Sequence, residues 1–376
     1  MITRIIENNF IESLKHNKVL LLSGPVKVGK TVFAASCLEK MNLTYETIDF
    51  GNRAIRKKFA LLSENELIWY FNQYQCIVIG NAQHFERLQF VLDNVLTEQI
   101  KASLILASAF DPPIIEDLRD ALKWEGLEFY LPALTYHELT QTYGMMREEQ
   151  RIEHRLIYGN YPQIADFPDN TEDLLHEILE ATIATQLGID DRINKKEALI
   201  RTLQIAAHLV GEAISYNQIA EKIGVDNETV QRYLELLEKA HLLFVLPSYH
   251  TEQKYELKKL HFVYFADNGI RNALINNFNP LSMRMDEDAL WKNWLIAERI
   301  KWNKMNGKNY QYFFWRSHTR QQVDFIEKQE QQITGHRFIL DKKKKIKNPP
   351  LFAAYYPEIV FKSINRTGYL TFLTQK

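Results

Sequence analysis

The chain has 376 residues, of which 46% are hydrophobic and 12% aromatic, a composition typical of a globular protein with two or three compact domains. Its formal net charge of -1 excludes a global electrostatic attraction to nucleic acid or to a membrane surface and leaves only local patches open.

Cysteine usage and the N-terminal residues predict a cytoplasmic location. The two cysteines, Cys37 and Cys76, both fall in apolar or helical runs, which is typical of a reducing compartment rather than of a disulfide framework. The first residues contain acid and amide side chains where a signal peptide would be apolar, and no apolar run reaches membrane-spanning length. We therefore expect no contact with a membrane.

Short apolar segments alternate with helical patterns over the first part of the chain. This alternation predicts an α/β fold with a parallel sheet that is covered by helices on both faces. The expected strands are Val19–Leu22, Tyr45–Asp49, Cys76–Ile79, Ser103–Ala107 and Glu128–Leu131.

The first expected strand runs into a G-x-x-x-x-G-K-T pattern, the phosphate-binding loop of P-loop proteins. Gly24 and Gly29 allow the backbone N–H groups to point at phosphate oxygens, Lys30 would lie between the terminal phosphates, and the Thr31 hydroxyl would complete a Mg²⁺ shell. The pattern predicts that ATP or ADP binds with Mg²⁺. The residues expected to hold it are Gly24, Pro25, Val26, Lys27, Val28, Gly29, Lys30 and Thr31.

The third expected strand lacks the acids of an ATPase. Such enzymes place a carboxylate for magnesium at the end of this strand and an acid for the attacking water next to it, but this chain has Gly80 and Asn81 there. Loss of a general base costs about 10²–10⁴ in rate, so we expect hydrolysis to be weak or absent. Asp49 at a neighbouring strand end is a candidate substitute acid, and Ser108 is a candidate small polar residue near the γ-phosphate.

The order of these motifs, followed by Leu131–Leu139 and Tyr158–Pro162, resembles that of bacterial and archaeal AAA+-type ATPases whose C-terminal half was long called a domain of unknown function. The resemblance covers nearly the whole chain. It implies a P-loop AAA+-like domain, a winged helix-turn-helix and a restriction-endonuclease-like domain. The family's Asp-Glu-Ile-Gln is here the segment 80–83, and its Ala-Gly-Arg after the fourth strand is here 122–125, which has no arginine.

The middle of the chain predicts two helices about a tight turn. Ser215 and Gln218 have the spacing of a capping box, and Gly224 ends the first helix. A second helix over Asn227–Glu238 and a strand over Leu242–Leu246 complete the pattern of a winged helix.

The exposed face of that second helix favours a structural or protein-contact role over DNA binding. Phosphate attraction dominates DNA affinity, yet Arg232 is accompanied there by Glu228, Glu235 and Glu238. Further along, Asp267–Asn272 resembles the family's turn before its last domain, and we expect Gly269 to adopt a positive backbone angle.

The resemblance also implies a metal-binding nuclease motif, which this chain does not keep. Lys292 stands at the position of the family's helix Glu, Gln322 and Asp324 at the first strand pair, and Arg337 and Ile339 at the second. One carboxylate beside two cations would repel a divalent metal. We therefore expect Asp324 to pair with Arg337 or Lys292 and expect no nuclease activity.

These observations predict a P-loop AAA+-like domain over 1–145, a helical lid or linker over 146–194, a winged helix over 195–265 and a degenerate endonuclease-like domain over 266–376. The expected function is that of an ATP- or ADP-binding conformational switch. Two alternatives stay open: a DNA-binding regulator, and an active ATPase with a substitute acid. A protein partner or a homo-oligomer also stays open.

Overall fold

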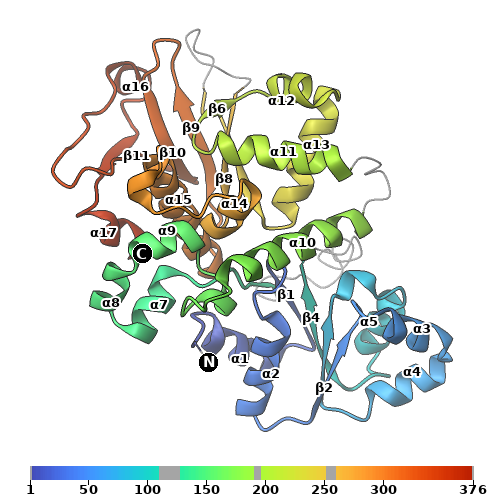
Figure 1. Ribbon diagram of the computed structural model, residues 1–376. Helices are drawn as coiled ribbons and strands as arrows, with labels where there is room; N and C mark the ends of the chain where they lie inside the picture. The colour runs from blue at the N-terminus through green and yellow to red at the C-terminus, as the bar shows by residue number, and fades with distance from the viewer. Residues whose placement is uncertain (1, 110–127, 190–195, 251–259, 375–376) are drawn as a thin grey trace. The chain divides into compact units, whose positions relative to one another are not determined.

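The computed structural model describes residues 2–109, 128–189, 196–250 and 260–374 (Figure 1). The chain divides into two compact units, Met1–Ala133 and Leu134–Lys376. Each unit is described by itself.

The first unit is built on a five-stranded sheet with the strand order β2-β3-β4-β1-β5, in which every neighbouring pair is parallel. The predicted α/β fold with a parallel sheet is thereby confirmed, and each predicted strand is correct to within a residue. The strands are β1 (Val19–Ser23), β2 (Tyr45–Asp49), β3 (Cys76–Gly80), β4 (Ser103–Ser108) and β5 (Glu128–Tyr130).

Helices cover both faces of this sheet (Figure 1). On one face, strand residues such as Ile77, Ile79 and Leu106 pack against the apolar sides of α3, α4 and α5. On the other face, Phe10 of α1 meets Phe33 of α2 edge to face. The bounds are α1 (Glu7–His16), α2 (Lys30–Lys40), α3 (Arg53–Leu61), α4 (Glu64–Phe71), η1 (Ala82–His84) and α5 (Leu88–Leu96).

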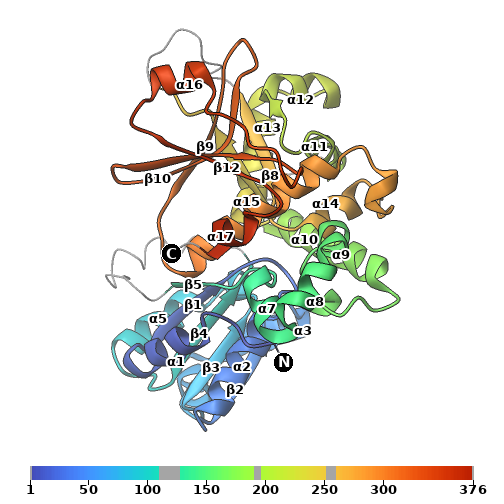
Figure 2. The ribbon, with the colours of Figure 1, turned by 90° about the vertical axis from the view of Figure 1, so that its left-hand side faces the viewer.

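The second unit contains two smaller sheets (Figure 2). One has three strands in the order β6-β8-β7, all antiparallel, and the other has four in the order β12-β11-β10-β9, in which only the β11–β12 pair is parallel. The strands are β6 (Ala213–Ile214), β7 (Leu243–Pro247), β8 (His261–Phe265), β9 (Gln311–Arg316), β10 (Gln322–Gln329), β11 (Gln332–Phe338) and β12 (Val360–Ile364).

Helices surround these sheets, and the longest of those described are α10 and α15, with 19 residues each. The helical bounds are α7 (Tyr136–Tyr143), α8 (Met145–Gln150), α9 (Ile152–Tyr158), η2 (Pro162–Ile164), α10 (Thr171–Ile189), α11 (Lys196–His208), α12 (Tyr216–Ile223), α13 (Asn227–Lys239), α14 (Asn268–Leu274), η3 (Leu281–Met283), α15 (Glu287–Met305), α16 (Pro350–Tyr355) and α17 (Tyr369–Thr374). Over the described part of the chain, no helix is long and apolar enough to cross a membrane.

Local signals set the ends of α12 and α13. The capping box of Ser215 and Gln218 forms, and Gly224 ends α12 in the left-handed conformation with φ of 72°. Asp226 then caps α13 by accepting a hydrogen bond from the Thr229 N–H at 2.7 Å. The predicted helix–turn–helix is therefore present, followed by the β7–β8 pair, while its assignment as a winged helix stays a prediction.

The prediction for Gly269 is wrong. This residue lies inside α14 rather than in a turn, and its φ is not positive. A Cβ there would lie 2.0 Å from the Tyr158 carbonyl oxygen, so a glycine is needed because two backbones approach closely. Asp267 caps α14 and also accepts the Asn160 N–H at 2.8 Å, which joins the Tyr158–Pro162 segment to the start of α14.

Helix α7, which falls within the predicted first domain of 1–145, belongs to the second unit. Its first backbone N–H, that of Tyr136, donates to Glu298 Oε2 of α15 at 2.6 Å. Because this buried bond fixes the start of α7 to α15, the helix joins the unit that contains α15. The predicted subdivision of the second unit stays a prediction.

Candidate functional site

Two glycines shape the loop between β1 and α2. Gly24 has φ of 150°, and a Cβ there would lie 2.1 Å from the Leu131 carbonyl oxygen beyond β5. Gly29, with φ of 86°, is in the left-handed conformation and directly precedes the first residue of α2. Both positions therefore need glycine, the first for space and the second for its backbone angle. The first turn of α2 has no side-chain cap, so its N–H groups are available to an anion.

Lys30 turns its ammonium group onto the loop. Its Nζ donates to the carbonyl oxygens of Gly24 at 2.8 Å and Pro25 at 2.7 Å. Burial lowers the pKa of Lys30 to about 7, because the charged ammonium loses its water and gains only neutral partners. A phosphate at the loop would supply the missing negative charge, so these residues fit a nucleotide.

Gly80 stands at the position of the missing acid, and its surroundings are tight. A Cβ built on Gly80 would lie 3.1 Å from Thr31 Cγ2 and 3.6 Å from Asp49 Oδ1. Asp49 and Gly80 are register partners at the ends of β2 and β3. A carboxylate from the neighbouring strand thus lies beside the position that the missing acid would occupy, next to the magnesium-binding candidate Thr31.

The three catalytic candidates are joined by hydrogen bonds across three strand ends. Asp49 Oδ1 accepts from Asn81 Nδ2 at 2.7 Å and from the Gly51 N–H at 2.8 Å. Gln83 Nε2 donates to Asn81 Oδ1 at 3.4 Å, and Ser108 Oγ donates to Gln83 Oε1 at 2.8 Å. We call Asp49, Asn81, Gln83 and Ser108 the polar row.

Sequence reasoning missed the role of Gln83 in the polar row. The signal was present, because Gln83 is the last residue of the family's Asp-Glu-Ile-Gln and the one that this chain keeps. Asn81, with φ of 51°, is in the left-handed conformation that asparagine tolerates. This conformation lets Asn81 and Gln83 share one turn at the end of β3. The segment 122–125, where the family has its arginine, lies outside the described residues.

Two of the nuclease-motif positions of the second unit, Asp324 and Arg337, form an ion pair. Asp324 is fully buried; it accepts the Phe338 N–H at 2.9 Å and lies 3.2 Å from Arg337 Nε. Lys292 instead pairs with Asp288 at 2.6 Å. Within the described residues, no three His, Cys, Asp or Glu side chains gather closely enough to hold a metal ion.

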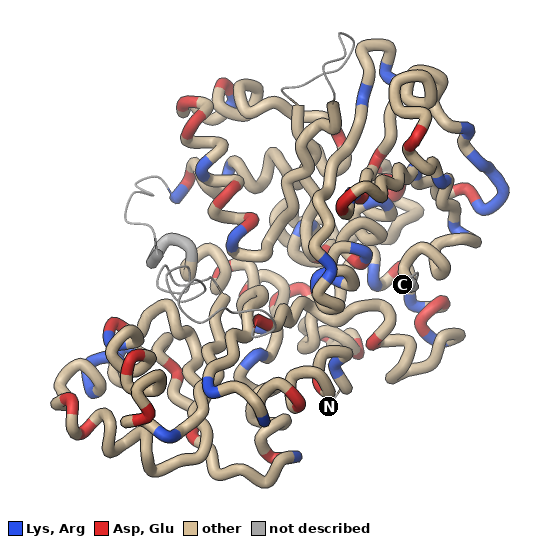
Figure 3. Tube along the Cα trace, turned by 180° about the vertical axis from the view of Figure 1, so that it is seen from behind, with Lys and Arg blue, Asp and Glu red and all other residues tan. Residues whose placement is uncertain are grey.

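Charged residues are interspersed along both units (Figure 3). One basic run lies in the loop after β11, where Lys342–Lys345 are exposed. Asp341 caps the backbone N–H groups of Lys343 and Lys344, and Asn365 Nδ2 donates to the Lys342 carbonyl. The loop is thus held by its own hydrogen bonds.

Comparison with known families finds similarity to a domain of unknown function (DUF8612) over residues 149–281. An uncharacterized protein from Haemophilus influenzae is 20% identical over 251 residues, which are 57% of this chain and 62% of that protein. The chain thus spans less than two thirds of that relative's length.

Among solved structures, the Walker-type ATPase Paby2304 of Pyrococcus abyssi is similar with a TM-score of 0.48 and 14% identity, covering 73% of this chain and 96% of that one. The RuvB Holliday junction branch migration motor of Thermotoga maritima is similar with a TM-score of 0.32 and 13% identity, covering 64% and 88%. Likenesses of this size do not define a function.

Proposed function

We propose that the chain binds ATP or ADP with Mg²⁺ at the loop of residues 24–31. The observation that carries the proposal is the Lys30 ammonium held over the loop by the carbonyls of Gly24 and Pro25, at the uncapped start of α2. A bound nucleotide would be held by the loop N–H groups and Lys30, and Thr31 would complete the shell of its Mg²⁺.

Thermal unfolding with and without Mg·ATP tests the binding site. A ligand at about 100 times its Kd stabilises the folded state by ~2.7 kcal/mol, which corresponds to a rise in Tm of ~3 °C or more for a chain of this length. We expect this rise in the wild-type chain and in Lys57→Ala, which removes an exposed lysine from α3. We expect no rise in Lys30→Ala. Equal shifts in the two variants would place the nucleotide elsewhere.

A second candidate function is slow ATP hydrolysis with Asp49 as the substitute acid. The nearness of Asp49 to Gly80 favours it, because Asp49 Oδ1 lies 3.6 Å from where the Gly80 Cβ would stand. The hydrogen bond from Asn81 holds this carboxylate at the strand ends. In this arrangement Asp49 would hold magnesium-bound water or accept a proton from the attacking water. Asn81 would orient the Asp49 carboxylate.

Phosphate release from three variants tests this second candidate. Asp49→Asn should lower the rate by about 10²-fold, the lower limit for loss of a general base. Adding Gly80→Asp to that variant should restore much of the rate, because the new carboxylate enters the same region without a charged neighbour. Asp93→Asn, an exposed acid of α5, is the matched control. If Asp49→Asn leaves the rate of phosphate release unchanged, Asp49 is not the acid.

We further propose that nucleotide occupancy acts as a conformational switch. Support comes from Gly24, which contacts the Leu131 carbonyl shortly before the second unit begins at Leu134. A nucleotide that draws Lys30 off the Gly24 carbonyl would alter the loop at that contact. Hydrogen exchange over residues 134–376 should then change with Mg·ATP in the wild type but not in Lys30→Ala. Identical exchange with and without nucleotide would rule out the switch.

A further inference from the structure

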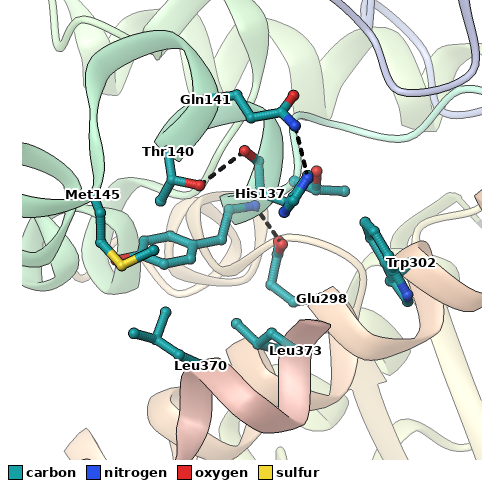
Figure 4. A pocket seen from close by; sticks show the side chains of 10 residues that line it. His137, Thr140, Gln141, Met145, Glu298, Trp302, Leu370 and Leu373 are labelled. Atoms are coloured by element: carbon teal, nitrogen blue, oxygen red, sulfur yellow. Dashed lines mark hydrogen bonds between the residues drawn. The ribbon is translucent and has the colours of Figure 1, made fainter. Parts of the chain in front are cut away.

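A cavity of about 280 Å³ lies within the second unit, between α7, α15 and α17 (Figure 4). Its walls come from the start of α7, from the first residue of α8, from one side of α15 and from the last described helix. The lining includes Tyr136, His137, Met145, Trp302, Leu370 and Leu373. None of its lining residues belongs to the loop of residues 24–31.

The walls are aromatic and aliphatic. Tyr136 and Leu373 are buried, and the His137 ring meets the Trp302 ring edge to face, with centroids 5.0 Å apart. Met145 lies at the rim and is 50% exposed. Three aromatic rings around one space favour an aromatic guest. Contacts between ring edges and ring faces add binding free energy to that gained from burying apolar surface.

Several polar groups of the lining are bonded to the protein itself, whereas the buried Trp302 Nε1 has no hydrogen-bond partner among the described residues. Thr140 Oγ1 donates to the His137 carbonyl at 2.9 Å, and Gln141 Nε2 donates to His137 Nε2 at 2.9 Å (Figure 4). Thr135 Oγ1 donates to Glu138 at 3.1 Å. Because of these bonds, a guest needs to offer few hydrogen-bonding groups to the pocket.

The one carboxylate in the lining, Glu298, is already compensated. It is 3% exposed and accepts hydrogen bonds from the Tyr136 N–H at 2.6 Å, from Lys301 Nζ at 2.9 Å and from Asn160 Nδ2 at 3.2 Å. Because a buried cation faces this carboxylate, a charged guest would gain no partner and would still lose its water. The chemistry therefore favours a neutral guest.

We propose that this pocket binds a neutral bicyclic aromatic group of the size of indole. A cavity of ~150 Å³ holds one benzene ring, so a volume near twice that value fits two fused rings. The group is carried either by a free small molecule or by a tryptophan side chain of a peptide. The proposal does not rest on the nucleotide site.

Binding of indole to the full chain, followed by ligand-observed NMR, tests the pocket. A ligand of this size should bind with a Kd on the order of 0.1–1 mM. Leu370→Trp, which fills the space from α17, should abolish binding. Met145→Ala should weaken binding about fivefold through lost apolar contact, whereas Met146→Ala, a neighbour that is 76% exposed and does not line the pocket, should leave it unchanged.

N-Acetyltryptophanamide distinguishes the two sources of the group. Binding of indole alone identifies a site for a free molecule, and binding of both compounds identifies a site that also admits a peptide side chain. Absence of saturable binding by either compound overturns the proposal. Equal affinities in Met145→Ala and Met146→Ala also overturn it, and this comparison holds even if Leu370→Trp does not fold.

Discussion

Asp49 and Gly80 lie next to each other at the ends of two neighbouring strands. They are partners in a parallel pair, so their side-chain positions lie at the same end of the sheet. An aspartate at position 80 would stand close to the Asp49 carboxylate, and two such charges repel each other and raise one pKa. We therefore propose that the site carries a single carboxylate, that of Asp49 on β2.

At Lys30, we predict that nucleotide binding takes up a proton. With a pKa of about 7, Lys30 is largely neutral at pH 8 in the free protein, and bound phosphates raise its pKa again. Below pH 7 the group is charged in both states, so affinity is independent of its titration. As the pH rises above 7, affinity should fall by about tenfold per unit until the pKa of the bound state is reached.

Calorimetry at pH 8 in buffers of different ionisation enthalpy measures this uptake. The observed binding enthalpy should change linearly with the buffer enthalpy, with a slope near one proton. Lys30→Arg is the matched control, because an arginine stays charged and should remove the slope. An unchanged enthalpy across buffers in the wild type would refute the depressed pKa.

At the scale of elements, the contact of α9 with α14 depends on Gly269. We predict that Gly269→Ala lowers the free energy of unfolding by ~3 kcal/mol or more, because its Cβ would lie 2.0 Å from the Tyr158 carbonyl oxygen. Gly224→Ala is the comparison, since that Cβ meets open space and costs only the left-handed backbone, ~1–2 kcal/mol. Urea unfolding measures both, and equal losses would contradict the close approach.

A second element-scale prediction concerns Asp286, which precedes α15 and binds two arginines. Arg271 Nη1 lies 2.5 Å and Arg284 Nε 2.8 Å from its carboxylate. Partial burial alone would raise the pKa of Asp286, but the hydrogen bond from Arg284 and the charge of Arg271 outweigh it and lower the pKa from 3.8 to about 2.

This depressed pKa stabilises the fold above pH 3.8, and the contribution is lost as the pH falls through 2. Unfolding in urea between pH 5 and 2 should therefore show a difference between the wild type and Asp286→Asn that shrinks with acid. A difference that stays constant over this range would mean that Asp286 titrates normally.

The helix ends also show what sequence could and could not predict. The capping box at Ser215 and the end of α12 at Gly224 depend on residues close together in the sequence, so both could be predicted from the sequence. Gly269 was misread because its constraint comes from Tyr158, far away in the chain. The same distance hid the polar row, in which Gln83 and Ser108 meet only after the strands are ordered.

At the scale of the whole molecule, alternation of strands and helices was enough to predict the parallel sheet, with residues 24–31 after the carboxyl end of β1. The boundary near residue 133 could not be read in this way, because Tyr136 is fixed by Glu298 from far along the chain. The aromatic pocket was likewise missed, since α7, α15 and α17 bring its residues together from distant segments.

Calorimetric titration of Mg·ATP into the full chain, with Lys30→Ala beside it, tests the central claim most directly. We predict saturable binding at one site per chain in the wild type and none in the variant. Absence of binding heat in the wild type across several temperatures, or equal affinity in the two proteins, would contradict a nucleotide site at residues 24–31.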